Sequence, residues 1–176
     1  MFLPDAHVNS IYDIELEQLK ERGIKGIIAD LDNTLVGAKE PLANPKLESW
    51  FKSVKQLGIQ VVIVSNNNES RVSTFAKPLS IPFIFAAKKP QNRAFRKALN
   101  LMNLSPEETA VVGDQLMTDV LGGNRSGLHT VWVKPVSAAD DGFFTRMNRR
   151  MERWVLLRMK KKGWLTWENQ NERQRS

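Results

Sequence analysis

Short apolar runs of strand length alternate with helical segments along most of this chain. The apolar runs lie at 24–30, 59–65, 81–87, 109–114 and 129–133. The helical segments lie at about 11–22, 45–57, 70–78, 91–102 and 116–126. In several runs the residues at both odd and even positions are apolar, as in strands that are buried on both faces of a sheet. This order predicts an α/β fold of βαβ units, in which helices cover both faces of a central parallel sheet.

Helix boundaries in the sequence support this division. Ser10 with Asp13 resembles the start of a helix, and Gly23 is a typical helix stop. Asn44 and Pro45 form a cap and a first-turn proline for the helix at 45–57. Residues 105–108 combine a capping box with a proline but leave room for only one turn.

Length and composition exclude several classes of protein. A chain of 176 residues suits one domain, and the absence of cysteine excludes disulfides, thiolate nucleophiles and cysteine-bound metals. Its two histidines, His7 and His129, are far apart in sequence, which argues against an imidazole metal cluster. No apolar run approaches the ~18 residues of a membrane span, and no secretory signal is recognisable at Met1. We therefore expect a cytoplasmic protein.

The net charge of +7 is confined to one end of the chain. Residues 1–142 carry 16 basic and 16 acidic side chains, whereas residues 143–176 carry ten basic side chains and three glutamates. This asymmetry predicts a neutral folded body at 1–136 followed by a basic tail at 137–176.

Each of four predicted strands ends in polar residues, which gives the first indication of a site. These residues are Asp30, Ser65, the Lys88–Lys89 pair and Asp114. Ligands of open parallel sheets bind beyond the carboxyl ends of the strands. The four strand ends are therefore expected to converge on one crevice.

Two of these strand ends carry pairs of carboxylates. Asp30 and Asp32 point to the same side of an extended segment, and such close carboxylates favour a shared proton or a cation between them. Asp114 and Asp119 form a second pair across the turn into a helix. An all-oxygen site favours a hard ion, above all Mg²⁺. The simpler alternatives are a solvated Asx turn for the first pair and a helix cap with one exposed carboxylate for the second.

The other two strand ends carry groups suited to an anion. Ser65 and Asn66 offer hydroxyl, amide and backbone N–H donors to phosphate oxygens, although a loop with a helix cap would have the same residues. Lys88 or Lys89 could neutralise an anionic intermediate, or could simply be solvated on a surface loop.

The order of the four signals resembles the haloacid-dehalogenase superfamily of phosphohydrolases. Its four motifs match DLDNT (30–34), Ser65, Lys89 and GDQLMTD (113–119). The resemblance spans roughly residues 24–134 and implies a three-layer, Rossmann-like fold. Lys89 fits better than Lys88, because the family pattern places its lysine directly before proline.

The resemblance also implies a role for each matching residue. Asp30 would be the nucleophile that forms an aspartyl-phosphate, Asp32 would protonate the leaving oxygen and then deprotonate water, and Lys89 would offset negative charge. In the substrate-binding part of the site, Thr34, Ser65 and Asn66 would support or hold the phosphate. The implied Mg²⁺ ligands are Asp30, the Asp32 carbonyl, Asp114 and Asp119.

Loop lengths argue against a cap domain. Asp30 and Ser65 are 35 residues apart, and Ser65 and Lys89 are 24 apart, with one predicted helix and one strand filling each interval. Capless members of the superfamily have open sites, which suit substrates too bulky for a closed pocket, such as a lipid surface, a protein or a nucleic acid.

Longer strings narrow the resemblance to the YqeG-type proteins of subclass IIIA. These strings are GIKGIIADLDNTLV, SNNNESRV, AKKPQNRAF and VVGDQLMTDVLGGNRSGLHTVWV. The group is related to phosphatidylglycerophosphate phosphatases, which implies a Mg²⁺-dependent phosphomonoesterase that makes phosphatidylglycerol. The alternatives are a capless phosphatase for a soluble or nucleic-acid phosphomonoester, and a non-catalytic protein that binds RNA or a ribosomal partner.

The basic tail independently indicates a membrane surface. Residues 143–165 place apolar side chains at helical spacing, with arginines mostly off that stripe, and three of the five tryptophans lie in the tail. A basic amphipathic helix with Trp, Phe and Met suits the bilayer interface, so residues 143–162 are expected to bind anionic lipid peripherally. The alternatives are a helix packed on the body and, with less support, a helix that binds nucleic acid.

Overall fold

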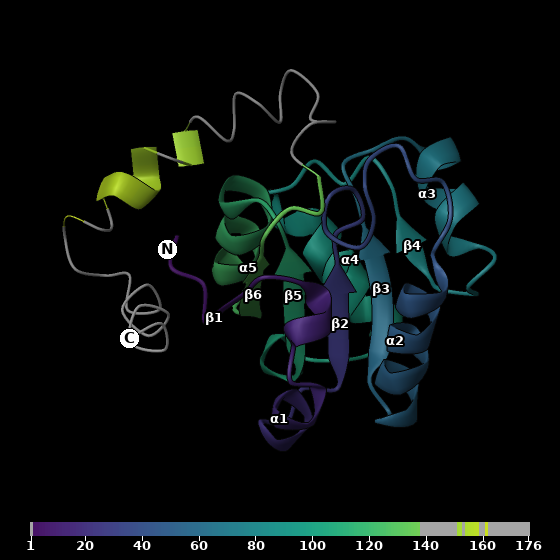
Figure 1. Cartoon of the computed structure of the whole chain (residues 1–176). Coiled ribbons are helices and arrows are strands. Elements are labelled where there is room, and N and C mark those ends of the chain that lie inside the picture. Colours follow the sequence, from purple (N-terminus) through teal and green to yellow (C-terminus); the bar gives the residue numbers. More distant parts are fainter. Residues whose placement is uncertain (1, 138–150, 153, 159–160, 162–176) are drawn as a thin grey trace, which may run out of the picture. The chain divides into compact units, whose positions relative to one another are not determined.

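The computed structural model describes residues 2–137, together with 151, 152, 154–158 and 161 (Figure 1). The chain divides into two units, residues 1–140 and 141–176. The described residues of the second unit have helical backbone. Most of the amphipathic helix expected at 143–165 lies outside the described residues and stays a prediction.

The first unit is built on a six-stranded parallel sheet, which confirms the predicted fold class (Figure 1). The strand order is β1-β6-β5-β2-β3-β4. The strands are β1 (Ala6–Val8), β2 (Gly26–Ala29), β3 (Gln60–Val64), β4 (Phe83–Ile84), β5 (Thr109–Gly113) and β6 (His129–Val133).

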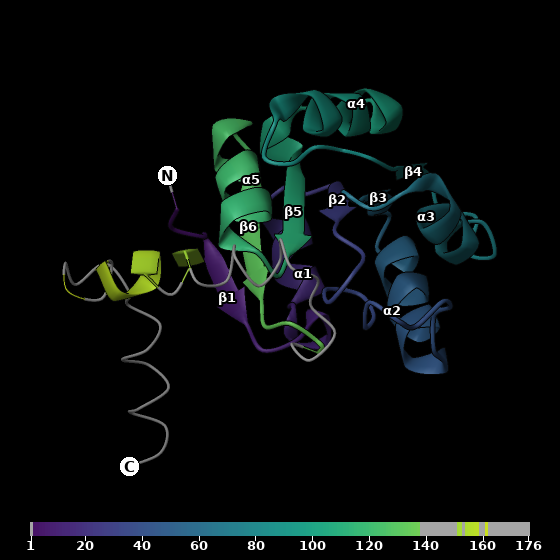
Figure 2. The same cartoon turned by 90° about the horizontal axis from the view of Figure 1, so that it is seen from above.

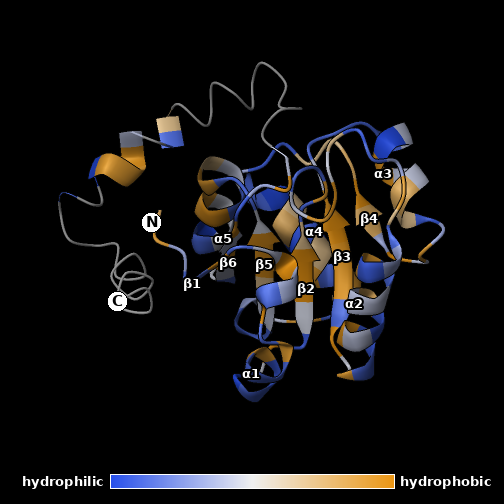
Figure 3. Ribbon diagram, viewed as in Figure 1, coloured by the Kyte–Doolittle hydropathy of each residue, from blue (hydrophilic) through white to orange (hydrophobic). Residues whose placement is uncertain are grey.

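Helices cover both faces of the sheet, so the fold has three layers (Figure 2). One face packs against α1 (Leu16–Glu21), α2 (Pro45–Gln56) and α3 (Glu69–Ala76), and the other against α4 (Asn92–Met102) and α5 (Leu121–Arg125). Alternating residues of β2 enter different cores: Ile27 packs on the first face and Ile28 on the second. The apolar strands accordingly lie inside the polar outer surfaces of the helices (Figure 3).

The strand β1 was missed by the sequence patterns because it is only three residues long. It is fixed by long-range parallel pairing with β6. The preceding residue supports this pairing, because Asp5 N donates to Thr130 O at 2.9 Å and Asp5 Oδ2 accepts from Thr130 N at 2.7 Å. Such a pairing leaves no local signal in Ala6–Val8.

Three predicted elements differ in extent from the observed ones. The helix expected at 11–22 is split into a 3₁₀ turn, η1 (Ile11–Asp13), and α1, because Ile14 between them is extended and buried. The strand expected at 81–87 stops at Ile84, after which the chain turns to bond residues 65–67. The helix at 116–126 begins as a π-helical segment, η3 (Leu116–Val120).

The strand order reverses at β2, because the strands that follow it in sequence lie first on one side of β2 and then on the other. Parallel sheets bind ligands in the crevice at such a reversal. The chain runs from β2 to β3 and β4, and then crosses to β5 on the opposite side of β2. Within 2–137, each connection between these strands holds one main helix, and no cap domain is present. Among the described residues, no helix has the length and apolarity needed to cross a bilayer.

Candidate active site

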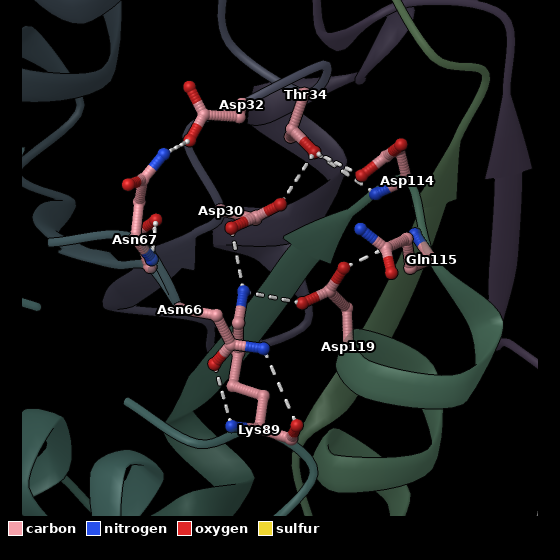
Figure 4. Close-up of polar contacts among 10 residues, drawn as sticks. Asp30, Asp32, Thr34, Asn66, Asn67, Lys89, Asp114, Gln115 and Asp119 are labelled. Atoms are coloured by element: carbon pink, nitrogen blue, oxygen red, sulfur yellow. Dashed lines mark hydrogen bonds and ion pairs between the residues drawn. The ribbon is translucent and has the colours of Figure 1, made fainter. Parts of the chain in front are cut away.

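Side chains from the ends of β2 and β5, from one loop and from the helical segment η3 meet at the carboxyl edge of the sheet (Figure 4). Asp30 directly follows β2, and Asp114 directly follows β5. Lys89 comes from the β4–α4 loop and Asp119 from η3, and all four side chains are buried. The predicted convergence of the strand ends is therefore observed for Asp30, Asp114 and Lys89, and Asp119 of η3 joins them.

The ammonium group of Lys89 holds two of the carboxylates. Its Nζ lies 2.7 Å from Asp30 Oδ1 and 2.7 Å from Asp119 Oδ1. The neighbouring Lys88 is exposed and has a left-handed backbone with φ of 54°, which leaves Lys89 as the lysine in the cluster. Asn66 fixes this loop, because its Oδ1 accepts from Lys89 N at 2.7 Å and its Nδ2 donates to Lys89 O at 3.4 Å.

Burial and charge act in opposite directions on this cluster. Burial alone would lower the pKa of Lys89, but the charges of Asp119 and Asp30 and their hydrogen bonds outweigh burial and raise that pKa. Burial raises the pKa of Asp119 to about 6, even though the Lys89 charge opposes this rise, and the nearby Asp30 adds to it. Asp119 therefore changes charge near physiological pH unless a further cation joins the cluster.

Thr34 links the two strand ends. Its Oγ1 lies 3.4 Å from Asp30 Oδ2 and 3.2 Å from Asp114 Oδ1, and it accepts a hydrogen bond from Asp114 N at 3.0 Å. This hydroxyl thus lies between the two aspartates and fixes the backbone of Asp114.

Two local features place the Asp119 side chain over the end of β5. The π-helical η3 follows the strand after only Asp114 and Gln115, and Gln115 N donates to Asp119 Oδ2 at 3.2 Å. Such wide helical turns are frequent at functional sites. A Cβ at Gly113 would lie 2.2 Å from Asp119 Cγ, so only glycine leaves space for this carboxylate.

Three buried carboxylates form a set that fits a divalent cation. Oxygen atoms of Asp30, Asp114 and Asp119 lie within 4.8 Å of one another. Lys89 is the cation that ion-pairs with two of them, which leaves the three carboxylates with an excess of negative charge. Hard oxygen donors with excess charge are what Mg²⁺ and similar ions prefer.

The Asp32 carboxylate lies apart from this cluster and has its own partners. Its Oδ2 accepts from Asn67 Nδ2 at 3.0 Å, and its Oδ1 lies 3.0 Å from Arg71 Nε and 2.8 Å from Arg71 Nη2. Ser65, one of the three predicted substrate-binding residues, accepts from Asn67 N through its hydroxyl at 3.1 Å. Ser65 and Asp32 are thus connected through one residue.

Arg71 is a site residue that the sequence reasoning did not select. It lies in the first turn of α3, whose N-cap is Asn68, and this helix start turns the guanidinium toward Asp32. The sequence did offer a signal for Arg71: it follows a helix cap by three residues and lies beside the predicted phosphate loop.

We expect Arg71→Gln to lower kcat for a soluble phosphomonoester about tenfold while KM changes little, because Asp32 loses its ionic anchor and its fixed orientation. Steady-state kinetics measure both constants, and Arg71→Lys should recover part of the loss. An unchanged kcat in Arg71→Gln would show that Asn67 alone positions Asp32.

Comparisons with known proteins identify related phosphatases. A family model described as mitochondrial PGP phosphatase matches residues 1–137. The chain is 56% identical over 167 residues to the probable phosphatase YqeG of Bacillus subtilis, covering 95% of this chain and 96% of that protein. It is 30% identical over 171 residues to phosphatidylglycerophosphate phosphatase 1 of Arabidopsis thaliana, covering 92% of this chain and 49% of that protein. The chain therefore spans about half the length of the Arabidopsis relative.

Solved structures share the fold at lower identity. The cobalt-bound deoxy-D-mannose-octulosonate 8-phosphate phosphatase of Haemophilus influenzae has a TM-score of 0.53 at 18% identity, covering 73% of this chain and 77% of that chain. A putative HAD superfamily (subfamily IIIA) hydrolase of Legionella pneumophila has a TM-score of 0.51 at 22% identity, covering 68% and 71%.

Proposed function

The chain belongs to the family described as mitochondrial PGP phosphatase, and on that premise we propose that it converts phosphatidylglycerophosphate to phosphatidylglycerol. The predicted resemblance to the haloacid-dehalogenase superfamily and to its YqeG-type members is confirmed, and the chain is a phosphoric monoester hydrolase. The substrate is the proposed part, and it is supported by the two related phosphatidylglycerophosphate phosphatases of Arabidopsis and Chlamydomonas.

The observation that carries the chemistry is the buried Asp30 carboxylate, which lies 2.7 Å from the Lys89 ammonium group at the open edge of the sheet. In the proposed reaction, Asp30 attacks phosphorus, and the bond from phosphorus to the leaving alcohol oxygen breaks as the aspartyl-phosphate forms. Asp32 gives its proton to that oxygen and later takes one from the water that releases phosphate.

Lys89 makes the attack electrostatically feasible. A carboxylate and a phosphate dianion repel each other, and a fixed cation between them stabilises the charge that develops during transfer. Because Lys89 is already paired with Asp30 and Asp119, it is in place before the substrate arrives.

We propose that Asp30, Asp114 and Asp119 hold a Mg²⁺ ion, with the Asp32 carbonyl as a further ligand. The donor set supports this assignment, since the three carboxylates are buried, close together and made only of oxygen donors. When bound, the ion would supply a second positive charge against the phosphoryl oxygens.

Metal affinity is expected to fall at acid pH. The folded-state pKa of Asp119 is raised to about 6, and a proton on this carboxyl competes with the cation. We expect titration calorimetry with Mg²⁺ to give roughly tenfold weaker binding at pH 5 than at pH 7.5. Asp119→Asn should bind weakly at both pH values; a wild-type affinity independent of pH would contradict the role of Asp119 as a ligand.

The lack of a cap in 2–137 favours a substrate that stays anchored in a larger body while its phosphate enters the site. A phospholipid in a bilayer has this property. The direct test is phosphate release from phosphatidylglycerophosphate in mixed micelles, with and without Mg²⁺ and beside a soluble phosphomonoester. Hydrolysis of the soluble ester alone would retain the chemistry and reject the lipid, and inactivity on both would favour a binding protein.

The protein is further proposed to work in the cytoplasm at a membrane surface, held by its basic tail at 143–162. Ten basic side chains against three acidic ones in 143–176 support attraction to an anionic leaflet. When Arg146, Arg149 and Arg150 are all changed to Gln, we expect binding to phosphatidylglycerol vesicles to weaken at least tenfold. Each basic residue near the surface contributes about 1 kcal/mol to membrane binding. Sedimentation measures this binding, and an equal loss of soluble-ester hydrolysis would instead place the tail in the folded core.

A further inference from the structure

We propose that the carboxyl edge of the sheet docks on an anionic lipid bilayer through three exposed apolar side chains, Leu42, Phe85 and Val136. We call these three residues the apolar rim. The inference rests on the proposed lipid substrate, and it adds the surface through which the folded body itself meets the membrane.

The three residues lie on three separate loops that leave the same edge of the sheet. Leu42 lies between β2 and α2, Phe85 directly follows β4, and Val136 comes three residues after β6. These loops follow the carboxyl ends of parallel strands, where the arrowheads point in Figure 1 and where Asp30 and Asp114 lie. Backbone contacts join two of them to site residues: Ala86 N donates to Asn67 O at 2.8 Å, and Val136 N donates to Asn33 O at 2.8 Å.

The exposure of large apolar side chains is concentrated at this edge. Within residues 2–137, four large apolar side chains are strongly exposed: Leu42 (54%), Phe85 (41%), Leu101 (53%) and Val136 (54%). Three of the four form the apolar rim, and Leu101 lies near the end of α4 that faces away from the site. Exposed apolar groups gathered on one surface mark an interaction site more strongly than scattered ones.

Charge complementarity identifies an anionic partner. Exposed lysines accompany the rim on the same loops and helix starts, namely Lys39, Lys46, Lys88 and Lys134. Arg93 at the start of α4 adds a fifth exposed basic group, and the exposed acidic residues on these loops and helix starts are Glu40, Glu48 and Glu69. The basic side chains beside the rim would therefore attract it to an anionic leaflet.

A cavity lies beside Val136 of the rim and Thr34. It has a volume of about 370 Å³, and its lining includes Val136 of the rim and Thr34, whose hydroxyl is 3.4 Å from Asp30 Oδ2. Lys46 and Lys134 also line it. This mixture of apolar and cationic groups suits the anionic headgroup region of a lipid that remains in the bilayer.

The absence of cysteine makes a direct test straightforward, because a single introduced cysteine can be labelled uniquely. Leu42→Cys, Phe85→Cys, Val136→Cys and the control Leu101→Cys would each carry an environment-sensitive fluorophore. On vesicles of phosphatidylglycerol and phosphatidylcholine containing a nitroxide-labelled lipid, we expect at least about twofold quenching at the three rim positions and none at 101. A combined Leu42→Ser, Phe85→Ser, Val136→Ser variant should partition onto these vesicles on the order of 100-fold less, whereas Leu101→Ser should match the wild type.

Three results would overturn the docking surface: quenching at 101 equal to that at the rim, no quenching at the rim of vesicle-bound protein, or no binding to the vesicles. Turnover of phosphatidylglycerophosphate by the same proteins in detergent micelles tests the proposed function separately. Quenching without turnover would support docking and reject the substrate, while turnover without quenching would support the substrate and reject docking.

Discussion

Asp30→Asn is expected to abolish phosphomonoester hydrolysis, with a loss in kcat of at least about 10⁴-fold, because an amide cannot act as the attacking carboxylate. The fold should survive the change. Asparagine has nearly the same shape, its amide oxygen can still accept from Lys89, and Lys89 keeps its contact with Asp119 at 2.7 Å. Phosphate release measures the activity, and circular dichroism and thermal melting report the fold.

A second variant links this loss to the covalent step. If Asp32 deprotonates the attacking water, the Asp32→Asn variant should hydrolyse its aspartyl-phosphate slowly. The phosphorylated variant should therefore accumulate, and intact-mass spectrometry detects the added phosphoryl group. Asp13→Asn, at an exposed carboxylate far from the site in sequence, is the matched control and should be fully active. Turnover retained in Asp30→Asn would refute the aspartyl-phosphate mechanism.

Part of this site can be predicted from the sequence, because residues that follow the strands of a parallel sheet lie at the same edge. Asp30 and Asp114 each follow a short, fully buried strand, and parallel strands place their carboxyl ends on one edge of the sheet. The strand pattern alone therefore brought these residues together. The resemblance to a family then favoured Lys89 over Lys88, and the structure places Lys89 in the cluster with its ammonium group buried.

Other features depend on contacts that have no local pattern. Arg71 reaches Asp32 across 39 positions of sequence, and its placement depends on how α3 starts at Asn68. The strand β1 exists only through its pairing with β6 at the far end of the body. The π-helical turn that returns Asp119 to the site depends on the missing side chain of Gly113, and periodicity cannot predict such a contact.

Removing the charge of Lys89 should affect stability as well as catalysis. Lys89→Met leaves the buried carboxylates of Asp30 and Asp119 without their shared cation, and Asp114 lies close to both. Breaking a buried ion pair by removing one partner typically costs about 3–5 kcal/mol, so we expect a loss of this size in the free energy of unfolding at pH 8 without metal. We also expect kcat to fall about 10³-fold.

The pH dependence of this loss distinguishes electrostatics from simple packing. In Lys89→Met, burial and repulsion by Asp30 raise the pKa of Asp119 without the opposing Lys89 charge, so the folded state binds a proton more readily than the unfolded chain. Its free energy of unfolding should therefore fall as pH rises, and the deficit relative to wild type should be smaller at pH 5 than at pH 8. Urea unfolding at both pH values measures the deficit, and Mg²⁺ at pH 8 should recover part of it.

Lys88→Met, which removes the neighbouring exposed charge, should unfold like the wild type. A deficit in Lys89→Met that is equal at both pH values and insensitive to Mg²⁺ would mean that the lysine acts through packing, and that its charge does not balance the three carboxylates.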